Sequence, residues 1–406
     1  MRETTLDNGV RVLTESIEGV RSAAVGVWIR QGSAHEDDSE LGASHLLEHL
    51  VFKGTERRTA RQLVLELEGL GGSIDAYTSR EHTSFQARVL SDHLPIAIDV
   101  LSDLVLRPKL RKSDLDLERE VVLEEIATVE DTPDDLVFEM HGEMLWNGHP
   151  YGRSILGTRE TVSELGADTL KLLWEKRYCG RNLIVAAAGH IDHEQVLADV
   201  GRHFEDLEPG SAPGVRTPGP GRTGVERIER ESAQSHLVFG AVTPGIADPV
   251  RYPLVMLAAA FGGGMSSRLF QKVREELALG YSVYSYQTFH TLGGVLGVYL
   301  GTRPGWEQRA VEAIRDEYRS IAESGLPDDE LEQIRQQVKG QLMLSLESTG
   351  ARLYRLAGSA LHDLPYRSLD DMLARLDAID ADEIRSAAAT FFDPDRQFLL
   401  TLGPSL

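Results

Sequence analysis

Along the first half of the chain, the spacing of apolar residues changes repeatedly between that of strands and that of helices. Residues 21–33 (RSAAVGVWIRQGS) have the short, mostly apolar pattern of a strand. Residues 73–90 form two strand-like segments around a turn at Ser79–Glu81. Apolar residues recur at helical spacing in four segments, residues 43–55, 59–72, 91–108 and 113–131.

Turn and cap residues support these assignments. Asn8-Gly9 lies between alternating apolar residues of LDNGVRVLTE, which predicts a hairpin. Thr59 followed by Gln62 predicts a capping box at a helix N-terminus, and Gly71 or Gly72 is expected to end that helix.

The second half of the chain begins in a comparable order. Residues 236–245 have strand character, residues 252–263 and 266–280 are helical, and residues 281–300 form a strand pair. The same succession of elements in both halves indicates a duplication. Strands grouped with helices in this order predict an α+β fold made of two similar α/β-sandwich domains.

A change in composition separates the halves. Residues 208–224 (EPGSAPGVRTPGPGRTG) are rich in Pro and Gly and have no hydrophobic pattern. Such a segment is typical of a semi-rigid linker. We therefore expect an N-terminal domain at 1–208, a linker at 209–224 and a C-terminal domain at 225–406.

The composition excludes several classes of protein. The 406 residues are 41% hydrophobic and 26% charged, as in an ordinary folded protein. Asp and Glu (64) exceed Lys and Arg (42), for a net charge of −22, which argues against a nucleic-acid partner. We find no apolar run long enough to span a membrane and no signal-peptide pattern in MRETTLDNGVRVLTE. With Cys179 as the single cysteine, a cytoplasmic location is expected.

The segment ASHLLEHLVFKGT carries the candidate chemistry. His45, Glu48 and His49 are spaced i, i+3 and i+4, so they share one face of an otherwise apolar helix. Two imidazoles at this spacing can bind one zinc ion, and the intervening glutamate can take a proton from water. The order His-x-x-Glu-His is the inverzincin signature. The alternative is a pair of structural histidines hydrogen-bonded to Glu48.

A zinc site of this kind needs a third protein ligand. The predicted helix SDLDLEREVVLEEIATVED offers five glutamates for that role. Two of them, Glu118 and Glu125, are seven residues apart and share a face, so one could support the other as ligand and outer partner. The five candidates are Glu118, Glu120, Glu124, Glu125 and Glu130.

Together these segments resemble the M16 metallopeptidases, which include pitrilysin, insulin-degrading enzyme and the mitochondrial processing peptidases. The resemblance begins with TLDNGVRV and runs through HLLEHLVFKGT, GGSIDAYTSREHTSF and EREVVLEEI into the second half. It implies that His45, His49 and Glu125 bind one Zn²⁺ per chain. It also implies that Glu48 is the general base and that Glu118 supports the site.

The resemblance also implies residues that bind substrate. Arg274 and Tyr281 match a paired Arg and Tyr that bind substrate and stabilise the oxyanion, a role for which both are suitable donors. The segment with Gly72, Asp75 and Ala76 matches an edge strand to which an extended substrate adds. Asp75 stands where the family commonly has Asn, so it lacks the amide donors. The triple glycine after residue 261 has no Gly-Lys-Ser/Thr and is not a P-loop.

The resulting hypothesis is a short, two-domain zinc endopeptidase of the M16 type. Zinc-bound water would attack the peptide bond with Glu48 as general base, inside a chamber that a homodimer encloses around unfolded peptides. The alternative is a non-catalytic scaffold or partner subunit of a heteromeric processing peptidase. The sequence does not distinguish a general oligopeptidase from a processing enzyme with one client.

Overall fold

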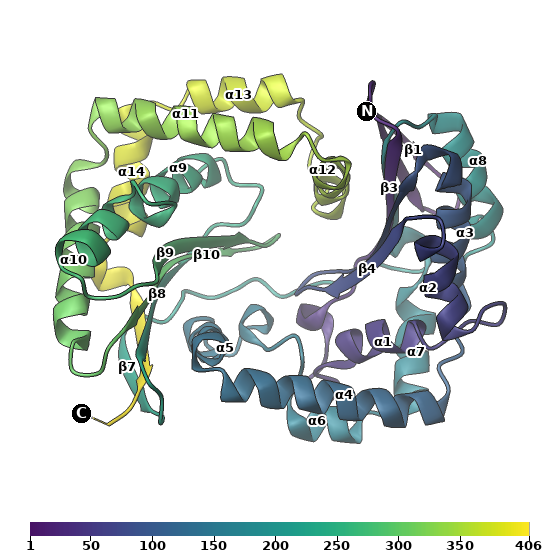
Figure 1. The fold of residues 1–406 in the computed structure, drawn as a ribbon, viewed down its shortest axis with the longest axis horizontal. Coiled ribbons are helices and arrows are strands. Elements are labelled where there is room, and N and C mark those ends of the chain that lie inside the picture. The colour runs from purple at the N-terminus through teal and green to yellow at the C-terminus, as the bar shows by residue number, and fades with distance from the viewer. Residues whose placement is uncertain (406) are drawn as a thin grey trace. The chain divides into compact units, whose positions relative to one another are not determined.

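The computed structural model describes residues 1–405, which form two compact units, each built on one β-sheet (Figure 1). Unit 1 comprises Met1–Ala127, Arg153–Val215 and Ser345–Tyr366. Unit 2 comprises Thr128–Gly152, Arg216–Leu344 and the chain from Arg367 onwards. The two similar α/β domains expected from the sequence are confirmed.

Unit 1 has a six-stranded sheet in the order β1-β2-β6-β3-β5-β4. Its strands are β1 (Arg2–Thr5), β2 (Arg11–Ser16), β3 (Ser22–Ile29), β4 (Ser73–Thr78), β5 (Thr83–Leu90) and β6 (Leu183–Gly189). The pair β2–β6 is parallel, and the other pairs are antiparallel. The predicted hairpin is the β1–β2 connection, where Gly9 has φ 96°.

Helices cover both faces of this sheet, so β3 is buried on each side. Val25 and Val27 of β3 join the core beneath the helices of the first half, whereas Ala24 and Trp28 pack against α12 (Thr349–Leu361). The helices of the first half in unit 1 are α1 (Ala43–Val51), α2 (Ala60–Glu68), α3 (Leu94–Leu106), α4 (Lys112–Asp131), α6 (Arg159–Glu164), α7 (Ala167–Arg177) and α8 (His193–Phe204).

Unit 2 repeats this plan with five strands in the order β7-β11-β8-β10-β9. They are β7 (Gly224–Glu229), β8 (Ser235–Thr243), β9 (Val283–Phe289), β10 (Gly294–Thr302) and β11 (Phe398–Gly403). Its parallel pair, β7–β11, matches the pair β2–β6 of unit 1. Its antiparallel strands β11, β8, β10 and β9 match β6, β3, β5 and β4 in that order. The helices are α5 (Pro133–Leu145), α9 (Arg251–Gly262), α10 (Glu307–Ser324), α11 (Asp328–Ser345), α13 (Leu369–Asp377) and α14 (Ala381–Phe391).

The compact units depart from the continuous ranges 1–208 and 225–406 in one respect. Each unit contains a helix from the other half of the sequence: α12 in unit 1 and α5 in unit 2. The Pro/Gly-rich segment has neither helix nor strand before β7 begins. Its ends are held by hydrogen bonds, from Gly180 N to Glu208 O and from Arg222 N to Leu145 O.

One local expectation is confirmed and one needs correction. Helix α2 has the predicted Thr59/Gln62 capping box, and Glu68 is its last helical residue. The two glycines end the helix as expected: Gly71 has φ 75°, and the N–H groups of Gly71 and Gly72 donate to Glu68 O and Leu67 O. Residues 266–280 contain a π-helix, Phe270–Glu276, where a regular helix was expected.

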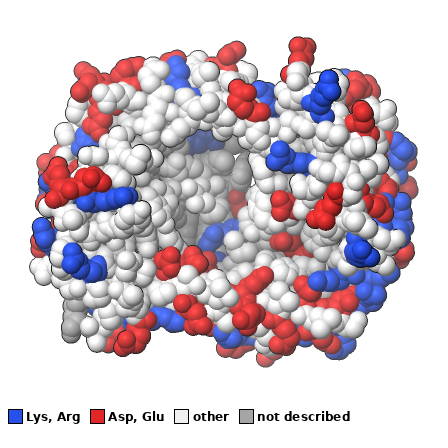
Figure 2. All heavy atoms as spheres, in the orientation of Figure 1, with Lys and Arg blue, Asp and Glu red and all other residues white. Residues whose placement is uncertain are grey.

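Asp and Glu side chains are scattered over the visible surface of both units, with Lys and Arg interspersed among them (Figure 2). The negative net charge of the chain is therefore spread over that surface rather than gathered at one site. No helix within residues 1–405 is both long and apolar enough to cross a bilayer.

The His141 imidazole joins α5 to the sheet of unit 2 and should make this unit acid-sensitive. His141 is 2% exposed, and its Nε2–H donates to Phe398 O at 3.1 Å. Burial lowers the pKa of His141 to about 4, against a smaller opposing effect of that hydrogen bond. Because the folded-state pKa lies below 6.5, this contribution to stability is present above pH 6.5 and is lost as the pH falls towards 4.

Between pH 7 and pH 4 the free energy of unfolding should fall in both the wild type and His141→Gln. We expect the fall to be about 3 kcal/mol smaller in His141→Gln, because glutamine has no imidazole to protonate. Urea denaturation at both pH values measures the difference. The exposed His190, changed to Gln, is the matched control. Equal losses in His141→Gln and wild type would contradict the assignment.

Candidate metal centre

Helix α1 has one face in the core and one face of polar groups. Leu46, Leu47 and Leu50 are at most 1% exposed and pack beneath the sheet of unit 1. His45, Glu48 and His49 occupy the remaining face and are half-buried. The helix is therefore fixed in rotation by its leucines, which determines where the three polar groups point.

A buried glutamate caps the N-terminus of α1. The two Glu36 carboxylate oxygens accept hydrogen bonds from Gly42 N (2.9 Å) and Ser44 N (2.7 Å). These N–H groups lack partners within the helix, and a carboxylate at this end also faces the positive end of the helix dipole. Burial raises the pKa of Glu36 to about 7, although the Ser44 and Gly42 N–H groups act in the opposite direction. Sequence reasoning missed Glu36, since no local spacing links it to His45.

Three side chains meet as expected for a metal-ligand set. Glu125 Oε2 lies 3.7 Å from His45 Nε2, and Glu125 Oε1 lies 3.7 Å from His49 Nε2. One potential ligand atom from each of the three residues lies within 4.8 Å of the others. Ligand atoms on one tetrahedral zinc ion, each about 2.0 Å from it, are about 3.3 Å apart. The observed distances are too long for hydrogen bonds and close to that separation.

Glu118 lies behind His49 rather than beside the ligand atoms. Its Oε2 is 3.1 Å from His49 Nδ1, and its Oε1 is 2.5 Å from Lys53 Nζ. Because a carboxylate only accepts, the His49 proton resides on Nδ1, which leaves the Nε2 lone pair directed at Glu125. This is the outer partner that a metal-bound imidazole requires.

His45 lacks such an outer partner. Its Nδ1 is buried and has no hydrogen-bond partner within residues 1–405. Burial, and secondarily the neighbouring His49, lowers the pKa of His45 to about 4. The neutral imidazole is the form that binds metal ions. Two imidazoles that face a carboxylate therefore fit a divalent cation of the zinc type.

Glu48 is held by the end of strand β4. Thr78 Oγ1 donates to Glu48 Oε2 at 2.7 Å. Burial raises the pKa of Glu48, and the Thr78 hydrogen bond opposes this shift. A partly desolvated carboxylate with raised basicity, next to a metal-ligand set, is suited to proton transfer.

Strand β4 is the outer strand of the sheet, and its open edge can be assigned from two hydrogen bonds. Ser79 N donates to His82 O across the β4–β5 turn, and Ser91 N donates to Arg21 O across β5–β3. Along an antiparallel strand, successive residues direct their backbone N–H and C=O groups alternately to one neighbour and to the other, and the two bonds agree on which residues of β5 face β4. The backbone of Ala76 therefore faces the open edge, whereas the backbone of Asp75 faces β5. The Gly72 N–H is already used by Leu67 O.

The structure also brings Arg274 and Tyr281 together, within unit 2. The Arg274 guanidinium carbon lies 4.3 Å from the centre of the Tyr281 ring and 4.5 Å from that of Phe270. The π-helix carries Arg274, and Tyr281 follows it with 76% of its surface exposed. The metal-ligand set belongs to unit 1.

Comparison with known proteins assigns both halves to one family. Residues 11–159 match the family model of insulinase (peptidase family M16), and residues 164–338 match that of the peptidase M16 inactive domain. The first range contains the whole metal-ligand set together with Glu48 and Glu118.

The similar relatives are full-length matches. An uncharacterized zinc protease of Streptomyces coelicolor is 40% identical over 100% of this chain and 90% of its own length. An uncharacterized zinc protease of Bacillus subtilis is 36% identical over 100% of this chain and 98% of its own length. A crystal structure titled as the peptidase M16 inactive domain from Pseudomonas fluorescens has a TM-score of 0.94 at 20% identity, covering 100% of this chain and 98% of that one. The crystal structure of a protease from Helicobacter pylori has a TM-score of 0.92 at 20% identity, covering 99% of this chain and 99% of that one.

Removing the outer partner of His49 should weaken metal binding. We expect Glu118→Gln to lower zinc affinity about tenfold or more, because the His49 tautomer and ring orientation lose their charged acceptor. Competition with a chromogenic chelator measures the affinity without any need for activity. Glu120→Gln, on the exposed side of the same helix, is the control. Unchanged affinity in Glu118→Gln would remove Glu118 from the site.

Proposed function

This chain belongs to the M16 peptidase family, and from that premise we propose that it is a zinc-dependent endopeptidase that hydrolyses extended peptides. The observation that carries the proposal is the set His45, His49 and Glu125, with Glu48 beside it. A non-catalytic scaffold would not need to keep both the ligand set and the neighbouring carboxylate.

Each residue of the set has a distinct task in this proposal. His45, His49 and Glu125 hold one zinc ion, which when bound would polarise a peptide carbonyl and lower the pKa of water at the site. Glu48 accepts a proton from the attacking water and returns it to the leaving amine. Thr78 fixes one Glu48 oxygen, and Glu118 keeps the His49 proton on Nδ1.

Substrate would add as a strand to the open edge of β4. The Ala76 N–H and C=O then bind the substrate backbone, and the turn at Gly72 ends the pairing. Backbone pairing tolerates many sequences but requires an extended, unfolded substrate. Asp75 would contact substrate through its side chain, because its own backbone groups face β5.

Arg274 and Tyr281 would stabilise the developing oxyanion and bind substrate. The stacked pair presents a guanidinium and an exposed phenol, and both groups donate hydrogen bonds. We propose that the pair acts in a homodimer, with the Arg274 of one subunit serving the metal centre of the other. With one cysteine in the chain, the cytoplasm is the proposed location.

The direct test of the chemistry separates metal binding from hydrolysis. We expect Glu48→Gln to bind zinc with nearly wild-type affinity and to lower kcat by about a thousandfold, because the amide cannot accept the proton. The readouts are metal content and the rate of cleavage of an unstructured peptide. Glu68→Gln, exposed on α2, should retain full activity. An active Glu48→Gln enzyme would rule out the proposed base.

A mixing experiment tests the homodimer. His49→Ala and Arg274→Ala should each be inactive alone. After refolding or subunit exchange of equal amounts, half of the dimers are mixed and one of their two sites is intact, so about a quarter of wild-type activity should return. If the pair acts within one chain, or the protein is a monomer, no activity returns.

A further inference from the structure

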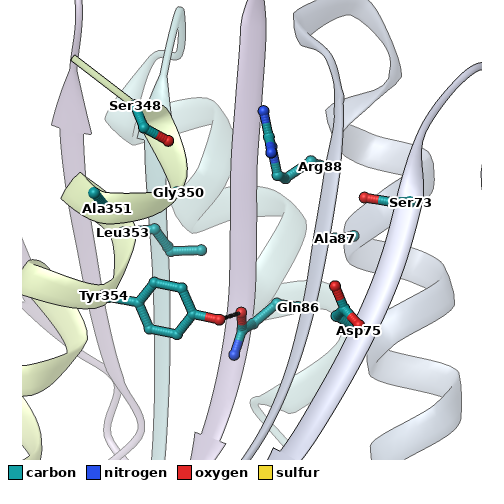
Figure 3. Close-up of a pocket in the computed structure, with 10 residues that line it drawn as sticks. All are labelled: Ser73, Asp75, Gln86, Ala87, Arg88, Ser348, Gly350, Ala351, Leu353 and Tyr354. Carbon is teal, nitrogen blue, oxygen red and sulfur yellow. Dashed lines mark hydrogen bonds between the residues drawn. The ribbon is translucent and has the colours of Figure 1, made fainter. Parts of the chain in front are cut away.

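Unit 1 has a pocket on the face of its sheet that is opposite to α1. The pocket has a volume of about 340 Å³ and lies between the β4–β5 hairpin and the first turns of α12 (Figure 3). Asp75, Gln86, Arg88 and Tyr354 supply its functional groups. A volume near the lower end of the range for ligand sites suits one side chain rather than a whole ligand molecule.

The pocket exists because α12 covers only part of this sheet face. Its apolar residues pack on β2, β6 and β3, whereas Ser73 and Asp75 of β4 and Arg88 of β5 stay exposed on the same face. Side chains alternate along a strand, so Asp75 points to this face whereas its neighbour Ala76 packs towards the core of unit 1. The pocket is therefore separate from the metal-ligand set but borders the same edge strand.

Two opposite charges in the pocket remain unpaired. Asp75 and Arg88 are both exposed, and within the described chain neither side chain forms a hydrogen bond or ion pair. Asp75 pairs with Gln86 across the strands, and Arg88 pairs with Ser73. In Figure 3 the Arg88 side chain is directed away from Asp75, so the two charges stand apart along the pocket.

The wall beside Asp75 is aromatic and fixed. Tyr354 Oη donates to Gln86 Oε1, and Gln86 Nε2 donates to Ser84 Oγ at 2.9 Å. The Tyr354 ring lies 6.2 Å, centre to centre, from the Tyr77 ring on β4. Two phenol rings next to an unpaired carboxylate form a surface that attracts cations.

The register of an added strand selects which charge a substrate meets. A residue paired opposite Asp75 would have its side chain on the same face, with the two Cβ atoms about 5 Å apart. Arg88 is on β5, one strand further from the edge, so it lies about 5 Å further than Asp75 from the added strand. The nearer charge dominates, so this position favours a positive side chain.

We propose that Asp75, with the Tyr77 and Tyr354 rings, forms a subsite that selects a Lys or Arg side chain of the substrate. The stem of the side chain lies on the rings and its charged end meets the Asp75 carboxylate. Arg88 limits the subsite to one cation. This inference rests on the proposed addition of substrate to the edge of β4.

The test measures binding and cleavage separately. Short unstructured host peptides carry one Lys or one Glu, moved through each position. Their binding to Glu48→Gln protein is measured by fluorescence polarisation, and their cleavage by the wild type is measured by mass spectrometry. At one position Lys should be preferred over Glu by about tenfold at low salt, and added salt should reduce this ratio. Asp75→Asn should bring the ratio within about twofold, and Asp75→Lys should reverse it.

Asp92→Asn is the control, because it makes the same change at an exposed residue of unit 1 outside the pocket and should leave the ratio unchanged. Cleavage with no Asp75-dependent ratio would overturn the subsite and leave the peptidase standing. Asp75-dependent binding without any cleavage would support the subsite and remove the proposed function. Absence of binding by any host peptide would overturn the subsite as well.

Discussion

The site depends on how the face of α1 with His45, Glu48 and His49 is held against its surroundings. Leucines on the other face anchor the helix in the core, and Glu36 fixes its N-terminus through two hydrogen bonds. Buried polar groups are costly unless each has a partner, and here the partners come from two separate segments, β4 and α4. Thr78 holds Glu48, Glu118 holds His49, and Glu125 faces both imidazoles. A cation would sit between the two Nε2 atoms and the Glu125 carboxylate.

The duplication shows what the same framework does without this chemistry. In unit 2, helix α9 follows strand β8 as α1 follows β3, and it packs beside the outer strand β9 as α1 packs beside β4. Val255, Ala258 and Ala259 of α9 have the spacing i, i+3 and i+4 and line a pocket of about 340 Å³. Ser285 of β9 donates to Ala258 O, much as Thr78 of β4 donates to Glu48. Apolar side chains thus replace the polar set, and the fold persists without it.

Much of this could be predicted from the sequence because its signals are local. Three examples are the capping box at Thr59, the hairpin at Asn8-Gly9 and the spacing of His45 and His49. Each of these signals spans only a few residues. The third ligand could be narrowed from five glutamates only by resemblance, since helical spacing gives a face but not a distance.

What could not be predicted depends on contacts between distant segments. Glu36 reaches Gly42 and Ser44 through a loop, which has no periodic pattern to identify it. The exchange of α5 and α12 between units pairs residues hundreds of positions apart, and both helices have ordinary amphipathic sequences. The π-helix at Phe270–Glu276 forms i→i+5 hydrogen bonds in place of i→i+4 bonds, and a seven-residue segment is too short for the spacing of its apolar residues to reveal the difference.

The central claim, a metal-dependent peptidase, is tested most directly by incubating the purified, zinc-loaded protein with a mixed pool of unstructured peptides, with and without a zinc chelator. Mass spectrometry then identifies the products. The account predicts cleavage at internal peptide bonds that the chelator abolishes and added zinc restores. Intact peptides after incubation with the zinc-loaded protein, or cleavage that the chelator does not affect, would contradict it.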